Sequence, residues 1–415
     1  MILRTRDIIE QIRQGEIPKG YIRTVSGISP TDWKRYTFGD IYTERKEPGD
    51  ENLPLLMVSI HSGVSDGEVD EAELPKKVKR IEDKSQYKKA VSGDLVFNMM
   101  RAWQGAIGTV RTTGMVSPAY IVAKPNDKAY PLFMDYYTRT PQMINQIDRQ
   151  SYGVTDFRKR LYWDSFTPIG CILPPVAEQQ KIAAILTTQD KVIELKEKRL
   201  AHKQRQKKYL MQQLLTGKKR LPGFNGEWKK TKLKNILHER KTYSPKGLDY
   251  PHVTLSTEGI FPKSERYDRD HLVRDEDKEY KITHKGDICY NPANLKFGAI
   301  CENTFGDAIF SPIYVTFEVR KNVCREYLAN YLMRWDFINA VRKYEEGTVY
   351  ERMAVKPEDF LKFEIFLPQL EEQTAIAEVL SAADREIELL RQDIEQEKQK
   401  KKALMQLLLT GIVRI

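Results

Sequence analysis

Side chains able to bind a nucleic acid gather in four short polar segments of this 415-residue chain. Residues 101–104 and 152–160 lie in its first half, and residues 294–297 and 346–352 lie in its second. Arginine pairs with guanine edges, asparagine and glutamine pair with adenine, and lysine binds phosphate. The candidate DNA-binding residues are therefore Arg101, Trp103, Gln104, Tyr152, Thr155, Arg158, Lys159, Arg160, Asn294, Lys296, Thr348, Tyr350 and Arg352. The alternative is that these surface loops have drifted without selection.

Motifs for catalysis are missing from the same sequence. It contains neither a GxxxxGK[ST] phosphate loop nor an HExxH zinc motif, and its six histidines show no ligand spacing. An amino-methyltransferase would need an Asn/Asp-Pro-Pro-aromatic loop, and the nearest approach is Asn291-Pro292-Ala293-Asn294, which lacks the second proline and the aromatic residue. The sequence predicts a protein that is not an enzyme by itself and holds no metal.

The elements that would position the four polar segments occur twice. Residues 173–195 recur as residues 367–389, and residues 214–217 recur as residues 408–411, both at an offset of 194. The preceding parts repeat more sparsely, and their matched pieces are Gly93-Asp94 and Gly286-Asp287, Gly105-Ala106 and Gly298-Ala299, Ser117-Pro118 and Ser311-Pro312, and Trp33 and Trp228. A duplicated chain is expected to have internal two-fold pseudo-symmetry, so what one half does should be done twice.

Each repeat begins with a globular block of short β-like runs, found for example at residues 93–98, 119–123 and 312–319. Helical stretches follow at residues 132–148 and 326–343. This order predicts an α+β module built on a twisted, mixed and largely antiparallel sheet. The two blocks share framework pieces and differ in the polar segments, as two readers of different sequences would.

Each repeat ends with a heptad-like helical segment. In the second segment Leu380, Ile387, Ile394 and Leu408 are spaced by multiples of seven, which is the pattern of a coiled-coil seam. Neither helix can bury its seam alone, so the two are expected to pack on each other and run antiparallel. The seam of the first helix has a polar centre, formed by Gln189, Lys196 and Lys203, which leaves the tightness of the coil open.

Composition narrows the class of protein further. A net charge of +10 indicates a polyanionic partner, because each phosphate neutralised by a basic side chain releases counterions. No run of 18 apolar residues occurs, so no membrane span is expected. The start, Met1-Ile2-Leu3-Arg4, leads into charge and not into a signal peptide. The four cysteines are widely spaced and are expected to be reduced thiols in the cytoplasm.

With its duplication, the paired Glu-Gln entries (Glu178-Gln179, Glu372-Gln373) and the Leu-Leu-Thr-Gly exits, the chain resembles the specificity subunit of type I restriction–modification systems over essentially its whole length. The resemblance implies two target-recognition domains, each reading one half of a bipartite asymmetric DNA site. It also implies two adenine-N6 methyltransferase subunits docked on the helical regions, and restriction subunits in the full complex. S-adenosylmethionine, ATP and Mg would belong to those partners, and none is expected on this chain.

The resemblance also gives domain boundaries. These are an N-terminal helical segment (1–20), target-recognition domain 1 (21–171), helical region 1 (172–217), target-recognition domain 2 (218–365) and helical region 2 (366–415). Residues 8–15 weakly echo residues 210–217, as a further trace of the repeat or as an ordinary amphipathic helix. The alternative function is a non-catalytic coiled-coil scaffold that binds proteins instead of DNA.

Overall fold

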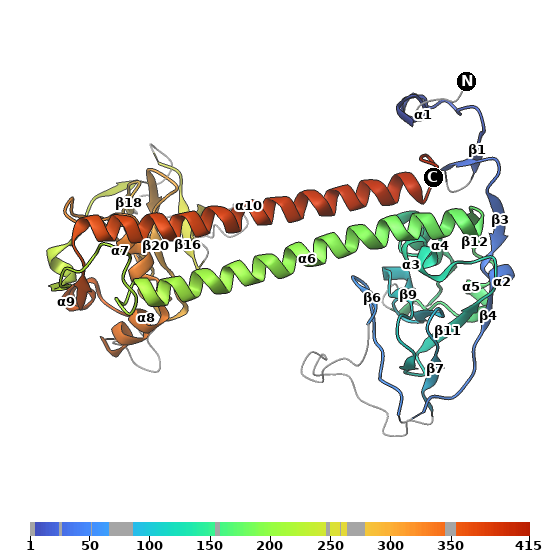
Figure 1. The fold of residues 1–415 in the computed structure, drawn as a ribbon, viewed down its shortest axis with the longest axis horizontal. Helices are drawn as coiled ribbons and strands as arrows, with labels where there is room; N and C mark the ends of the chain where they lie inside the picture. Colours follow the sequence, from blue (N-terminus) through green and yellow to red (C-terminus); the bar gives the residue numbers. More distant parts are fainter. Residues whose placement is uncertain are drawn as a thin grey trace. The chain divides into compact units, whose positions relative to one another are not determined.

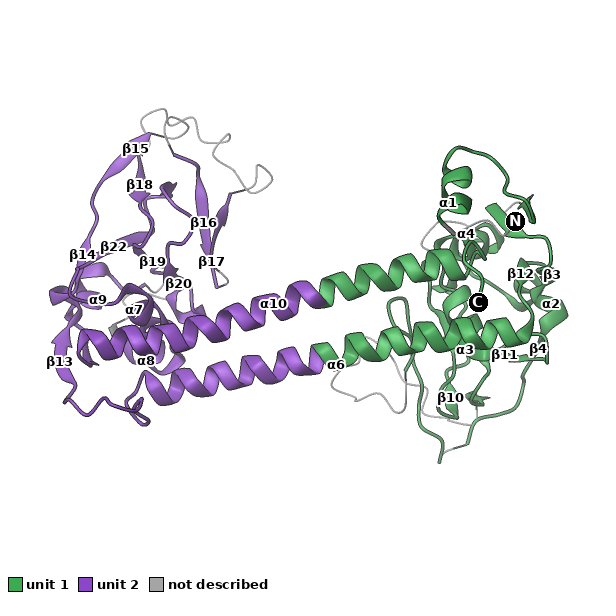
Figure 2. Cartoon of the chain, turned by 45° about the horizontal axis from the view of Figure 1, so that its top comes forward, with its two compact units in different colours: residues 1–196, 394–415 green, residues 197–393 purple. Residues whose placement is uncertain are grey.

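The computed structural model describes residues 5–24, 27–50, 52–65, 86–153, 158–245, 250–257, 259–263, 279–344 and 354–415. The chain forms two compact units, unit 1 (residues 1–196 and 394–415) and unit 2 (residues 197–393), coloured separately in Figure 2. Each unit combines one globular block with part of each of two 39-residue helices, α6 (Val176–Leu214) and α10 (Leu370–Leu408), labelled in Figure 1. No helix of the described part is long and apolar enough to cross a membrane.

Unit 1 is built on a four-stranded antiparallel sheet. Its strands lie in the order β4 (Tyr42–Glu44), β11 (Tyr120–Pro125), β8 (Leu95–Asn98) and β9 (Ile107–Thr109). The remaining strands pair as β1 (Tyr21–Thr24) with β2 (Gly27–Pro30), β3 (Lys34–Thr37) with β12 (Gly170–Leu173), β5 (Val58–Ser59) with β6 (Gly63–Val64), and β7 (Lys88–Ala90) with β10 (Gly114–Val116). The helices are α1 (Thr5–Arg13), α2 (Phe38–Ile41), α3 (Pro131–Tyr137), α4 (Pro141–Gln150) and α5 (Trp163–Phe166).

Unit 2 repeats this plan. Its four-stranded sheet has the order β14 (Leu237–Glu239), β22 (Val315–Val319), β19 (Ile288–Tyr290) and β20 (Ile300–Glu302). The other elements are β13 (Lys229–Lys232) with β23 (Glu364–Leu367), β15 (Tyr243–Pro245) with β18 (Glu279–Thr283) and β21 (Ala308–Phe310), β16 (Val253–Ser256) with β17 (Gly259–Pro262), and helices α7 (Arg325–Leu332), α8 (Trp335–Val341) and α9 (Pro357–Lys362). All these strand pairs are antiparallel, and the parallel pairing among the described residues is confined to two isolated bridges. The predicted α+β fold is confirmed.

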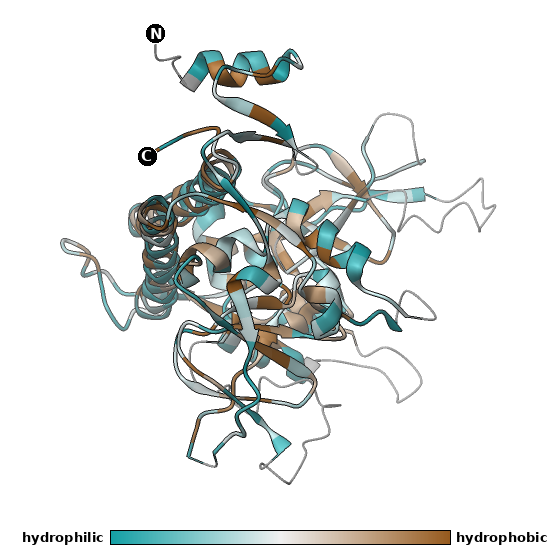
Figure 3. Ribbon diagram, turned by 90° about the vertical axis from the view of Figure 1, so that its right-hand side faces the viewer, coloured by the Kyte–Doolittle hydropathy of each residue, from teal (hydrophilic) through white to brown (hydrophobic). Residues whose placement is uncertain are grey.

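Aromatic rings at matched positions fill the cores of both units. In unit 1 the ring of Phe166 lies 4.7 Å from that of Phe97, and in unit 2 the ring of Phe360 lies 4.9 Å from that of Tyr290. All four side chains are fully buried. Figure 3 colours hydrophobic segments brown among the strands and short helices of the chain. Burying such large apolar surfaces is the main favourable contribution to folding.

The helical stretches predicted at residues 132–148 and 326–343 are each broken in two. In unit 1 the break precedes Pro141, whose ring removes a backbone N–H and disfavours helical geometry in the residue before it. Thr140 caps the new helix by accepting a hydrogen bond from the backbone N–H of Met143 at 3.4 Å. Arg334 holds the equivalent N-cap position in unit 2. The same fold thus carries different side chains at matched positions.

The long helices run antiparallel inside each unit, as predicted. In unit 1 Lys401 of α10 is paired with Asp190 of α6. In unit 2 Lys203 of α6 lies 2.9 Å from Glu386 of α10, and Lys207 is paired with Asp384. Residue numbers therefore rise along one helix as they fall along the other.

Acidic residues of α10 satisfy the polar centre of α6. In unit 1 the amide of Gln189, which is only 7% exposed, donates to Glu397 at 2.6 Å, and Lys196 binds the same carboxylate at 2.8 Å. Lys203 has its own partner in unit 2, described above. The centre of the seam is therefore a paired polar layer, which fixes the register of two helices more than it stabilises them.

The polar layer predicts a pH dependence. Hydrogen bonds from Lys196 and Gln189 lower the pKa of Glu397 to about 2. Because this carboxylate ionises more easily in the folded chain, its contribution is complete above the ordinary pKa of about 4.3 and is lost as pH falls toward 2. Thermal melts by circular dichroism between pH 5 and pH 3 should show a smaller loss of Tm for Glu397→Gln than for wild type. Equal losses would mean that this carboxylate is not coupled to folding.

The N-terminal segment ends as the long helices do. Gly15 has φ +84° and donates its N–H to Ile12 O at 3.1 Å, while Gly217 has φ +71° and donates to Leu214 O at 3.3 Å. Glycine is suited to this left-handed terminus because it has no Cβ. Because many helices end at such a glycine, residues 8–15 fit both a trace of the repeat and an ordinary amphipathic helix. Figure 3 shows apolar and polar residues alternating along α1.

Candidate nucleic-acid interface

A buried ion pair holds the same turn at the start of the central strand in each unit. In unit 1 the Nε of Arg45 donates to Asp94 at 2.6 Å, and in unit 2 the Nε of Arg240 donates to Asp287 at 2.9 Å. Both aspartates are nearly fully buried, and their hydrogen bonds raise the pKa of each arginine. The Gly-Asp pieces of the repeat are therefore framework, which positions the loops that leave these strands.

The first candidate segment of each unit is a short 3-10 helix that follows the central strand. η3 (Ala102–Gln104) ends at Gly105 with φ +101°, and η8 (Leu295–Phe297) ends at Gly298 with φ +89°. Both glycines have left-handed backbone that a side chain would strain. The two η helices thus project different side chains from the same backbone.

Unit 1 brings its two candidate segments together. The ammonium of Lys159 lies 5.6 Å from the ring centroid of Trp103 and 3.0 Å from the carboxylate of Asp148. Tyr152 and Arg160 exchange both backbone hydrogen bonds, at 3.1 Å and 3.0 Å. The loop that carries Lys159 is therefore closed at its base and packed on the η3 segment.

The side chains of this cluster differ in exposure. Tyr152 is 61% exposed, and its ring lies 5.3 Å from that of Tyr162. Trp103 is half-buried and donates its indole N–H to Met100 O at 3.0 Å. The other exposed candidates are Arg101, Gln104, Arg158 and Arg160. Thr155 lies outside the described residues. Exposed guanidinium groups and aromatic rings are side chains that suit contacts to phosphates and base edges.

Unit 2 presents a smaller described set. Asn294 is exposed, and the ammonium of Lys296 lies 5.2 Å from the ring of Phe297, which is 60% exposed. The other candidates of this unit, Thr348, Tyr350 and Arg352, lie outside the described residues. Val355, which follows them, donates its N–H to Pro292 O at 3.4 Å, and in unit 1 Leu161 donates to Met99 O in the same way.

A basic cavity in unit 2 adds residues that the motif search did not find. It measures about 370 Å³, and its lining includes Lys285, Arg320, Lys321 and Arg325. At the positions of the last three, unit 1 has Asn126, Asp127 and Pro131. Comparing the charges of the two copies position by position would have revealed the difference. A concave surface with several cations suits a phosphate.

The described cysteines and the described side chains able to bind metal can be compared with what a reactive thiol or a metal site requires. Burial raises the pKa of Cys171 and of Cys301 to about 12, so both are thiols at neutral pH. In the described part of the chain, no three side chains of histidine, cysteine, aspartate or glutamate gather as a metal site would require.

Comparisons with known proteins agree with this geometry. A family model described as the type I restriction modification DNA specificity domain matches residues 225–399. The chain is 23% identical over 429 residues to the type I restriction enzyme MjaVIII specificity subunit of Methanocaldococcus jannaschii, covering 93% of this chain and 94% of that protein. It is 27% identical over 270 residues to a protein of the same organism named as the MjaX specificity subunit, covering 59% of each. A chain solved in work on the assembly and conformational transition of the type I R-M system has the same fold, with TM-score 0.54 and 17% identity over 93% of this chain and 99% of that one.

Proposed function

We infer that this chain, which belongs to the specificity subunits of type I restriction–modification systems, recognises a bipartite asymmetric DNA site with its two units. Each unit reads one half-site. The chain itself is non-catalytic, and it docks two adenine-N6 methyltransferase subunits and the restriction subunits through its helical regions in the cytoplasm. S-adenosylmethionine, ATP and Mg act in those partners.

The observation that carries this proposal is one framework bearing two different sets of loops. The Arg45–Asp94 pair in unit 1 and the Arg240–Asp287 pair in unit 2 hold the start of corresponding central strands, β8 and β19, in the same way. The loops that leave this framework differ in the side chains that read bases and phosphates. A site with two unlike halves needs this arrangement, because one chain must hold two readers of different specificity.

The candidate residues have distinct roles in this proposal. In unit 1 the exposed arginines around Trp103 and Lys159 contact bases and phosphates of one half-site. In unit 2 Asn294 and Lys296 contact the other, and the basic cavity binds the DNA backbone. A protein-binding scaffold, the alternative function, would not need this set of cations beside base-reading side chains.

Base-resolution mapping of N6-methyladenine tests the proposal. DNA would come from a host without other adenine methylation that expresses this chain with its methyltransferase, and a control would omit this chain. We expect a bipartite motif only when the chain is present. If an intact, expressed methyltransferase produces no motif with the chain, the scaffold function is favoured.

Exchange of one loop should change one half of the motif. Replacing residues 152–160 with an unrelated loop of equal length should alter or abolish recognition of one half-site and leave the sequence of the other unchanged, because the loop is closed by its own backbone bonds at Tyr152 and Arg160. The same methylation mapping measures this. The exposed substitution Asn225→Ala, outside the candidate loops and the helical regions, is the control and should change neither half. A change in both halves would mean that the loop is framework.

A further inference from the structure

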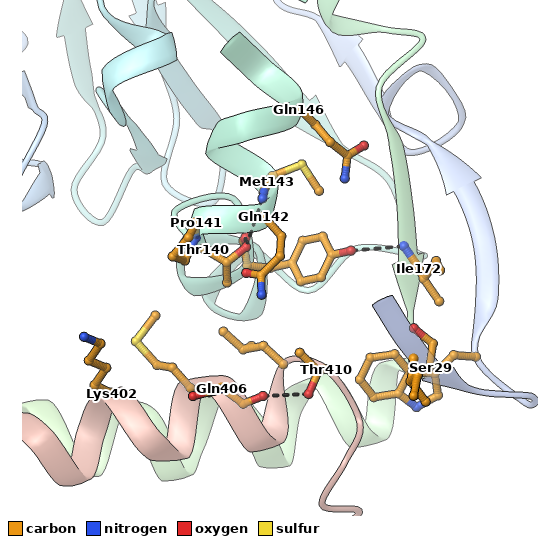
Figure 4. Close-up of a pocket in the computed structure, with 15 residues that line it drawn as sticks. Ser29, Thr140, Pro141, Gln142, Met143, Gln146, Ile172, Lys402, Gln406 and Thr410 are labelled. Carbon is orange, nitrogen blue, oxygen red and sulfur yellow. Dashed lines mark hydrogen bonds between the residues drawn. The ribbon is translucent and has the colours of Figure 1, made fainter. Parts of the chain in front are cut away.

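A cavity in unit 1 lies between α4 and the end of α10. It measures about 320 Å³ and is lined by apolar groups with amides and hydroxyls among them. Figure 4 shows Thr140, Gln142 and Met143 on one wall, facing Gln406 of α10 and Thr410 just after its end across the opening. None of these side chains belongs to the loops assigned to DNA reading.

Unit 2 shows what this place in the fold holds. There the side chain of Arg334 is only 10% exposed, and its guanidinium lies 4.7 Å from the ring centroid of Tyr331. Its Nη1 donates to Leu215 O at 2.8 Å, a carbonyl at the end of α6, and the Nε donates to Asp336 at 3.0 Å. The arginine therefore stacks on a ring and satisfies a helix-end carbonyl that has no partner within its helix.

Unit 1 keeps the receiving groups and lacks the arginine. Tyr137 stands at the position of Tyr331, and its hydroxyl accepts the backbone N–H of Ile172 at 3.1 Å. Leu409 stands at the position of Leu215, and no described residue donates a hydrogen bond to its carbonyl oxygen. Thr140 replaces Arg334. Tyr137 and Leu409 line the cavity of unit 1, and Leu215, Tyr331 and Arg334 line a cavity of about 420 Å³ at the matched place in unit 2, so the two cavities differ in the arginine.

We propose that this cavity is a binding site for an arginine side chain of the docked methyltransferase subunit. The guanidinium stacks on Tyr137 and donates to Leu409 O, as Arg334 does within unit 2. The choice of the methyltransferase as the partner rests on the proposed function; the choice of an arginine rests on the comparison of the two units.

The polar lining fits this occupant. Gln142, at the position of Asp336, offers an amide oxygen as acceptor in place of a carboxylate. The cation in the lining is Lys402, and unit 2 has Lys208 at the same position of α6 together with its bound Arg334. A lysine at this helix position is therefore compatible with a guanidinium nearby. An apolar floor with few acceptors favours arginine, which is more weakly hydrated than lysine.

The first test uses a small probe and the full chain. Saturation-transfer NMR titrations would compare Nα-acetylarginine amide with Nα-acetyllysine amide at equal ionic strength. We expect wild type to bind the arginine probe about tenfold more tightly than the filled variant Thr140→Arg with Gln142→Asp, in which the cavity has its own arginine. The lysine probe should not distinguish the two proteins. Equal affinity of the arginine probe for both overturns the proposal.

A reciprocal variant keeps the test decisive if the filled variant does not fold. Arg334→Thr with Asp336→Gln removes the resident arginine from the matched cavity of unit 2 and should create a second arginine site. No gain in bound probe would contradict the comparison of the two units.

The second test concerns the partner. The filled variant, co-expressed with the methyltransferase, should capture less of that subunit than wild type does. Unchanged capture by a chain that still yields the methylation motif overturns the assignment of the partner. If the wild-type chain also captures no methyltransferase and yields no methylation motif, the result would instead contradict the proposed function.

Discussion

Replacing Arg414 with methionine should lower the free energy of unfolding of unit 1 by about 2–4 kcal/mol. Its guanidinium binds Glu178 through two bonds, at 2.7 Å and 2.9 Å, and also binds Asp32 through two bonds of 2.8 Å. Glu178 is only 7% exposed, so the substitution leaves a buried carboxylate without its counter-ion. The estimate is reduced from that for a fully buried pair because the arginine side chain is 37% exposed.

Hydrogen exchange read by mass spectrometry measures this effect unit by unit, because each peptide reports on the part of the chain from which it comes. Peptides from unit 1 should lose protection in Arg414→Met, while those from unit 2 keep it. Arg220→Met is the matched control, since Arg220 binds Glu372 through two bonds of 2.6 Å in unit 2. In Arg220→Met, the loss of protection should appear in peptides from unit 2 instead of unit 1. Uniform loss in both variants would show that the pairs do not act locally.

The Arg414–Glu178 ion pair and its counterpart Arg220–Glu372 could have been predicted from the sequence. Arg220 and Arg414 lie three residues after the glycine that ends each helix, and Glu178 and Glu372 lie in the repeated Glu-Gln entries. Opposite charges that repeat together, one at the start of a helix and the other just beyond the end of its antiparallel neighbour, are expected to meet. The framework follows from the sequence for the same reason: two copies that share only selected residues reveal which residues the fold requires.

The candidate nucleic-acid interface was harder to predict from the sequence repeat. Periodicity places Trp103 and Lys159 in separate loops, and only the folded chain shows the ammonium against the indole ring. The arginine in unit 2 that Thr140 replaces in unit 1 is a single substitution whose meaning depends on packing. The sequence repeat identifies the residues that the two copies share. The proposed function depends on the residues in which the copies differ, and these act through contacts that only the folded chain shows.

Replacing Gly411 with alanine should destabilise unit 1 by about 2–4 kcal/mol. Gly411 has φ +71°, where a side chain strains the backbone by about 1 kcal/mol. Its new Cβ would also lie 2.6 Å from Pro30 Cδ and 2.9 Å from Trp33 Cζ2. Because proline and a buried indole cannot move away easily, the end of α10 must shift from its place in unit 1.

Gly217→Ala separates the two causes. Gly217 has the same φ of +71°, but its added Cβ would meet the nearest atoms, those of Trp228, at an ordinary 3.5 Å. It should therefore destabilise unit 2 by only about 1 kcal/mol, the backbone contribution alone. Hydrogen exchange of each unit measures both values, and their difference is the contribution of close packing at Pro30 and Trp33. Equal losses in the two units would show that backbone strain accounts for the whole effect and that the end of α10 is not tightly packed on unit 1.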